Sequence, residues 1–218
     1  IKIKSDLNRV TKANISIKVT RKFMKAVQED KPFTLSFTRE ETGETITKTV
    51  QARQLFHTIA EMNWNYAEPG FLFWDRIKEW NLLSNTKNFQ FAGTNPCAEE
   101  PLPAGGSCLL GSINLSEFVS KEGHFQFADF QQTVKTAVIA LNDVLDEGLP
   151  LHPLEEQRQS VTDWRQIGLG IFGLADMLIK YGAIYGSIES IKLCQKIGKT
   201  MIETAIDTSA ELAKKKGA

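Results

Sequence analysis

Apolar and polar residues alternate in three short stretches within the first fifty residues of this chain. Such a two-residue period is typical of strands that bury one face. Gly43 separates the second stretch from the third, so these two are expected to form a β-hairpin that projects from the surface. The predicted strands are residues 14–20, 32–37 and 45–50.

Apolar residues that recur at intervals of three and four predict helices over much of the remaining chain. In residues 52–67, Ile59 and Met62 lie on the apolar stripe and Trp64 widens it, until Pro69 ends the helix. A further short strand is expected at residues 167–169. The predicted helices are residues 21–30, 52–67, 129–147, 154–161, 171–181 and 187–216.

Two of these helices contain residues with a predicted role. Asp129 is expected to cap the start of a helix that Gly148 ends. In the last helix, the predicted buried stripe includes Ile191, Cys194 and Met201. Because a free cysteine behaves as a small apolar residue, Cys194 is interpreted as a structural thiol without chemistry.

The alternation of strands and helices favours an α/β fold, and no repeat or Pro/Ser-rich linker divides the 218 residues into domains. Lysine plus arginine and aspartate plus glutamate both count 26, which gives no electrostatic reason to expect nucleic-acid binding. Nothing at the start of the sequence resembles a signal peptide, and no apolar run of about 18 residues is present that would predict a membrane span. Three cysteines, an odd number, favour free thiols in a reducing compartment. We therefore expect a soluble cytoplasmic protein.

The chemistry of the chain is concentrated in residues 94–115, where Cys97 and Cys108 lie eleven residues apart among prolines and glycines. The prolines exclude a helix, so we expect a loop through Cys97, with Cys108 at the start of a short buried strand. If the loop is extended, Asn95, Cys97 and Glu99 point the same way. The thiol can then act as nucleophile, hydrogen donor or metal ligand, the carboxylate can take a proton from a hydroxyl, and the amide can hold that hydroxyl.

Other interpretations compete with this one. On spacing alone, Cys97 and Cys108 are explained equally well as ordinary buried cysteines beside a Pro/Gly loop. Residues 168–173 spell G-x-G-x-x-G, but no second strand with an acidic end follows, so close strand-to-helix packing explains these glycines better than a dinucleotide site. The histidines lack ligand spacing, and no metal site is predicted. The tryptophans are interpreted as core or interface residues, not as a base-stacking surface; they are Trp64, Trp74 and Trp80.

Four ordered blocks of the chain resemble the large, catalytic subunit of ribonucleotide reductases. Asn95-Pro96-Cys97-Ala98-Glu99, followed by residues 107–115, is similar to the catalytic segment of that family. The short spacing between the two cysteines is most similar to the adenosylcobalamin-dependent class, and the family resembled is that of the ribonucleoside-diphosphate reductases. The choice between a diphosphate and a triphosphate substrate depends on segments outside this chain. Four matching blocks are far more specific than one motif; the others are residues 14–24, 68–77 and 165–176.

The resemblance implies a ten-stranded α/β barrel of two parallel half-barrels, with Cys97 on a central loop, and residues 1–218 as the central part of that barrel. It implies that Cys97 becomes a thiyl radical that removes the ribose 3′ hydrogen, that Glu99 deprotonates the 3′ hydroxyl, and that Asn95 hydrogen-bonds the substrate. Cys108 would be one half of the redox-active dithiol that reduces the 2′ position. The implied cofactor is adenosylcobalamin, and the implied reductant is a thioredoxin-like dithiol.

The same resemblance implies that this chain needs further segments. The effector region with the second redox cysteine and the phosphate-binding segment are expected outside it, so the chain alone is expected to be inactive and prone to non-native association through exposed strand edges. Two alternatives stay open: a non-catalytic assembly piece of a split reductase, and a large subunit served by a separate metal-radical subunit. The expected partners are the ribonucleotide, the remaining segments, the reductant and a second copy in a homodimer.

Overall fold

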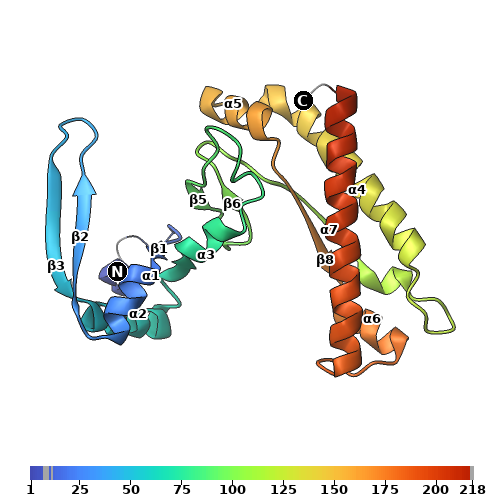
Figure 1. Ribbon diagram of the computed structural model, residues 1–218, viewed down its shortest axis with the longest axis horizontal. Coiled ribbons are helices and arrows are strands. Elements are labelled where there is room, and N and C mark those ends of the chain that lie inside the picture. The colour runs from blue at the N-terminus through green and yellow to red at the C-terminus, as the bar shows by residue number, and fades with distance from the viewer. Residues whose placement is uncertain (7–9, 11, 217–218) are drawn as a thin grey trace. The chain divides into compact units, whose positions relative to one another are not determined.

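The computed structural model describes residues 1–6, 10 and 12–216 (Figure 1). The chain separates into two compact units, Ile1–Pro101 and Leu102–Ala218, which are described separately below. The boundary falls at Pro101, within the Pro/Gly-rich stretch that the sequence pattern indicated as a loop and not as a division between domains. Part of the polar stretch that precedes the first predicted strand lies outside the described residues.

The first unit is built on a parallel pair of strands, β1 and β4, in which Ser16 pairs with Gly70 and Val19 with Phe73. An antiparallel hairpin of β2 and β3 extends from it, as the sequence predicts. The elements up to residue 79 are η1 (Lys2–Ser5), β1 (Ser16–Val19), α1 (Arg21–Gln28), β2 (Pro32–Thr38), β3 (Thr45–Gln51), α2 (Ala52–Tyr66), β4 (Gly70–Phe73) and α3 (Trp74–Glu79).

Local sequence explains the start of this unit. In β1, Val19 is buried while Ser16 and Lys18 are exposed, which is the predicted alternation. The hydroxyl of Thr20 accepts a hydrogen bond from the Phe23 backbone N–H at 3.1 Å and so caps α1. Phe23 then packs with Val19 and Ala52 in the core of the unit.

Two of the three tryptophans of this unit are not in its core. Trp74 is 8% exposed, but Trp64 is 89% exposed and Trp80 is 84% exposed. The prediction that Trp64 widens the buried stripe of α2 is wrong. Trp64 follows buried Met62 by two residues, about 200° around the helix, and therefore points away from the core.

The second unit has another parallel pair, β7 and β8, which aligns Leu109 with Ile167. The predicted strand at residues 167–169 is confirmed and runs further, through Phe172, so the helix expected from residue 171 begins only at Leu174. The elements are η2 (Leu115–Phe118), α4 (Phe127–Gly148), η3 (Leu149–Leu151), α5 (Glu155–Trp164), α6 (Leu174–Tyr181) and α7 (Ile188–Lys216), with β7 (Leu109–Asn114) and β8 (Ile167–Phe172).

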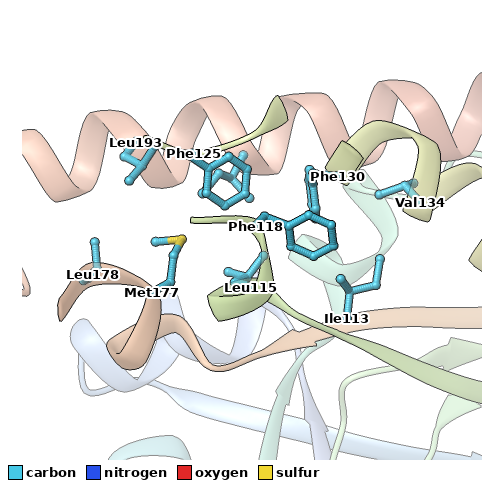
Figure 2. Close-up of a cluster of buried hydrophobic side chains, with 10 residues drawn as sticks. Ile113, Leu115, Phe118, Phe125, Phe130, Val134, Met177, Leu178 and Leu193 are labelled. Carbon is cyan, nitrogen blue, oxygen red and sulfur yellow. The ribbon is translucent and has the colours of Figure 1, made fainter. Parts of the chain in front are cut away.

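Figure 2 shows the buried core of the second unit, to which β7, η2, α4, α6 and α7 contribute. Phe130 of α4 is 0% exposed and meets Phe118 and Phe125 edge to face, with ring centroids 5.3 and 5.5 Å away. Leu193 packs into the same cluster from α7. Because aromatic side chains bury the most apolar area, this cluster accounts for much of the stability of the unit.

Two helix details differ from the predictions. Asp129 does not cap α4, because the helix begins two residues earlier at Phe127; its carboxylate lies in the first turn, where a negative charge still favours the helix. In α7, Cys194 is half-buried. The residues of α7 that enter the core form a different stripe from the predicted one, because the buried face of the helix is the face that contacts α4. Its buried residues are Ser190, Leu193, Ile197, Thr204 and Thr208.

The α/β class is correct, but the described residues do not form a closed barrel. Their strands form four separate sheets of two strands each. A barrel closes only when every strand has a partner on both sides, and here each strand has one. Among the helices of the described chain, none has the length and apolar content to cross a membrane.

Candidate active site

Cys97 lies at the tip of a tight hairpin that β5 (Gly93–Thr94) and β6 (Pro101–Leu102) close. The backbone N–H of Asn95 donates to the carbonyl of Glu100 at 3.1 Å, and the N–H of Ala98 donates to the carbonyl of Asn95 at 3.1 Å. The second bond closes a four-residue turn from Asn95 to Ala98. The predicted loop through Cys97 is therefore confirmed.

The backbone of this loop is turned, not extended. Ala98 adopts a φ of 69°, in the left-handed region. Asn95, Cys97 and Glu99 would point the same way only along an extended backbone, so the expectation of an extended loop is wrong. Asparagine followed by proline is itself a turn signal, because asparagine favours the first position and proline fixes φ at the second. That signal was available in the sequence.

The side chain of Asn95 braces the turn from inside. Its Oδ1 accepts a hydrogen bond from the backbone N–H of Glu100 at 3.0 Å, and the residue is half-buried. The hydroxyl of Thr94 donates to the Asn95 carbonyl at 2.9 Å. Although Oδ1 of the Asn95 side chain is engaged in this bond, the Nδ2 amide of the same carboxamide still carries N–H donors that can bind a hydroxyl group.

Cys97 and Glu99 both lie exposed at the tip. Cys97 is a free thiol and is not packed in the apolar core, which argues against the interpretation of it as an ordinary buried cysteine. The arrangement combines a thiol and a carboxylate on a turn whose backbone is fixed by hydrogen bonds. Such a tip can present both groups to a ligand.

Cys108 belongs to the second unit and directly precedes β7, as predicted. It is half-buried, and its Sγ lies 3.9 Å from the Leu109 carbonyl. The strand is only partly buried, since Leu110 is 58% exposed. The preceding loop packs on α5: Gly105 has a φ of 65°, and an added Cβ would lie 2.8 Å from the Glu156 carbonyl.

Two of the glycines in residues 168–173 lie in close contacts, as packing requires, but their neighbours belong to strand β7 and not to a helix. Gly173 has a φ of 70° at the start of α6, and an added Cβ would lie 2.1 Å from Oδ1 of Asn114. A Cβ at Gly170 would lie 3.3 Å from Oγ of Ser112. After β8, the described residues up to 216 form α6 and α7 and include no second strand of a dinucleotide site.

One contact near the base of the hairpin could not be predicted from the sequence. Lys18 of β1 places its Nζ 4.1 Å from the centroid of the Trp74 ring. The same Nζ donates a hydrogen bond to the carbonyl of Ala92, the residue before β5. No periodicity or motif predicts a contact between residues so far apart in sequence.

Comparison with known proteins gives a consistent result. Residues 1–218 match the family described as "Ribonucleotide reductase, barrel domain". The chain is 35% identical over 204 residues to the vitamin B12-dependent ribonucleoside-diphosphate reductase of Thermoplasma acidophilum, covering 94% of this chain and 26% of that protein. It is 32% identical to the enzyme of the same name from Mycobacterium tuberculosis, covering 94% of this chain and 28% of that protein. The ribonucleoside-diphosphate reductase large chain of Encephalitozoon cuniculi is 34% identical over 80% of this chain and 23% of its own length.

Proposed function

This chain belongs to the ribonucleotide reductase barrel-domain family, and we propose that within a complete enzyme it converts ribonucleotides to the 2′-deoxyribonucleotides used for DNA synthesis. The chain spans about a quarter of the curated relatives it matches, so the activity is proposed for the whole enzyme. The observation that carries the proposal is the exposed free thiol of Cys97 on a turn braced by Asn95.

We assign roles to four residues. Cys97, as a thiyl radical, takes the 3′ hydrogen atom of the ribose and returns it to the same carbon at the end of the cycle. Glu99 accepts the proton of the 3′ hydroxyl and later gives it back, and the carboxamide of Asn95 donates a hydrogen bond to the substrate. Cys108 and a second cysteine outside this chain supply two electrons and two protons. The 2′ hydroxyl leaves as water and the dithiol becomes a disulfide, which a thioredoxin-like dithiol reduces again.

The proposed cofactor is adenosylcobalamin, which the names of the relatives in Thermoplasma and Mycobacterium support. When bound, it supplies the organic radical from which the thiyl radical is generated. Cys97 fits this role, because an exposed thiol outside any disulfide can donate its hydrogen atom. The alternative is a separate metal-radical subunit, and the relative in Encephalitozoon, named a large chain, keeps it open. Activity that required such a subunit and ignored adenosylcobalamin would decide for the alternative.

The remaining features follow from the same proposal. We propose that the two parallel pairs, β1–β4 and β7–β8, belong to the two halves of a ten-stranded barrel, of which residues 1–218 are the central part. Their unpaired edges would then be covered by other segments of the enzyme. We propose a ribonucleoside diphosphate as substrate, a homodimer as the assembly and the cytoplasm as the location.

Cysteine variants of the complete reductase test this function, because the chain offers a matched control. Cys97→Ser is expected to abolish deoxyribonucleotide formation, and Cys108→Ser to abolish sustained turnover with a dithiol. Cys194→Ser, on α7, is expected to retain activity within about twofold, as for a residue that takes no part in the chemistry. Full activity of Cys97→Ser would reject the proposal and would support the alternative, in which the chain is a non-catalytic assembly piece of a split reductase.

A further inference from the structure

Lys18 connects the body of the first unit to the base of the Cys97 hairpin. Its ammonium lies over the ring of Trp74, 4.1 Å from the centroid, and donates a hydrogen bond to the carbonyl of Ala92. Ala92 is followed at once by β5, the first strand of the hairpin. Lys18, Trp74 and Ala92 all belong to the unit Ile1–Pro101.

The body side of this contact is firmly held. Lys18 is paired with Leu72 in the parallel β1–β4 register, and its neighbour Val19 is buried. Trp74 is buried at the start of α3. The backbone N–H of Arg21, the first residue of α1, donates to the carboxylate of Asp75 at 2.8 Å and ties the start of α1 to the same helix α3. Lys18 therefore projects from a fixed platform.

The hairpin side has less support of its own. Each of its strands, β5 and β6, is only two residues long, and its tip from Pro96 to Glu99 is exposed. A two-stranded hairpin is marginally stable in water without packing against something else. The position of Cys97 therefore depends on what holds the base of the hairpin.

A lysine suits this task for a chemical reason. An ammonium group carries three N–H donors, so it can satisfy a carbonyl and still lie against the electron-rich face of an indole. A hydrogen bond from a charged donor is stronger than one between neutral groups. An apolar side chain of the same length keeps the contact with the ring but loses both interactions of the charge.

We propose that Lys18 is a positioning residue for Cys97. Its ammonium contacts both the Trp74 ring and the Ala92 carbonyl, and so fixes the direction in which the hairpin projects from the rest of the unit. That direction determines the position of the Cys97 thiol. Lys18 acts through its hydrogen bond to the carbonyl of Ala92, which lies five residues before Cys97. It is not itself a catalytic residue. The inference rests on the proposed function for its catalytic consequence, but the tether itself can be measured without catalysis.

The first test is hydrogen–deuterium exchange on the 218-residue chain. Lys18→Met is expected to speed the exchange of the Asn95, Ala98 and Glu100 amides by about five- to tenfold, the loss expected for one charge-assisted hydrogen bond. Lys18→Arg, which can still donate and stack, is expected to exchange like the wild type. Lys25→Met removes the same charge from the neighbouring helix α1 and is expected to change nothing. Unchanged exchange in Lys18→Met would overturn the proposal.

The second test uses the complete reductase and separates positioning from folding. Since a misplacement of about 1 Å can cost on the order of 100-fold in rate, Lys18→Met is expected to lower kcat by about 10- to 100-fold, with KM within about twofold. Lys18→Arg should restore most of kcat. A loss in KM alone, or an equal loss in Lys25→Met, would refute the positioning role. If the wild type itself shows no reductase activity while the exchange result holds, the proposed function fails and the tether stands.

Discussion

Replacing Gly173 by alanine is expected to destabilise the second unit through one identifiable clash. Gly173 starts α6 with a φ of 70°, and the Cβ of an alanine there would lie 2.1 Å from Oδ1 of Asn114, at the end of β7. That oxygen also accepts the backbone N–H of Ser116 at 3.2 Å. The substitution therefore forces Asn114 out of its place.

The magnitude follows from three contributions. A left-handed conformation costs a residue with a Cβ about 1–2 kcal/mol. Displacing Asn114 loses its hydrogen bonds to Ser116 and Glu117, at about 0.5–1.5 kcal/mol each. The alanine restricts the unfolded chain and returns about 0.4–1 kcal/mol. We expect Gly173→Ala to lower the free energy of unfolding by about 1–4.5 kcal/mol in total.

Gly182 provides the matched control, because it ends the same helix with a φ of 85° and an added Cβ there meets no atom within 4 Å. Gly182→Ala is expected to cost only about 0–1.5 kcal/mol. In an Asn114→Ala background, which removes the clashing oxygen, Gly173→Ala should cost no more than Gly182→Ala. Native-state hydrogen exchange of the α4 amides as a function of urea reports the free energy of unfolding of this unit. Equal costs for Gly173→Ala and Gly182→Ala in the wild-type background would refute the reasoning.

Three further predictions concern the core, an ion pair and a thiol. Phe130→Ala, which empties the fully buried centre of the aromatic cluster, is expected to cost about 3–5 kcal/mol by the same measurement; a cost below about 1 kcal/mol would contradict the packing. Lys216 and Arg165 lower the pKa of Asp146, so this carboxylate stabilises the fold above its unfolded pKa of about 3.9, and the contribution is lost as the pH falls through the lowered folded pKa. Because Asp146 is partly exposed, Asp146→Asn should lower the free energy of unfolding by less than about 1 kcal/mol at pH 7, and by nothing at a pH below the folded pKa of Asp146. An equal loss at both pH values would contradict the lowered pKa. Cys97 should be the first thiol modified by a disulfide reagent in the native chain, and Cys97→Ser should remove that fast phase.

Local chemistry explains what was predictable about the candidate site. Three prolines in residues 96–103 prohibit a helix, and Asn95-Pro96 prescribes a turn, so Cys97 at a loop tip follows from the sequence. The apolar run after Cys108 likewise places that thiol at the start of a strand. The assumption of an extended loop was wrong because it overlooked the Asn95-Pro96 turn signal; the left-handed φ of Ala98 itself leaves no periodic trace in the sequence.

The faces of the helices show where local pattern was insufficient. Helix α7 has apolar residues on more than one side, and isoleucines such as Ile191 and Ile202 stay at least half exposed while Leu193 and Ile197 enter the core. A periodic pattern measures how apolar a face is, but not which face meets another element. The aromatic rings of η2 and α4 pack against one side of α7, and this contact determines which face of the helix is buried.

The sequence alone determined the α/β class, the positions of the longer helices and of five of the strands, and the two cysteines at a turn and a strand start, because these depend on interactions between residues close together in the chain. It did not predict the short elements β4, α3, β5 and β6. Only the tertiary structure decided that Lys18 meets Ala92, 74 residues away, and that Asn114 fills the space which glycine leaves at residue 173. Such contacts are set by where separate elements pack, and they have no local period that a sequence pattern can reveal.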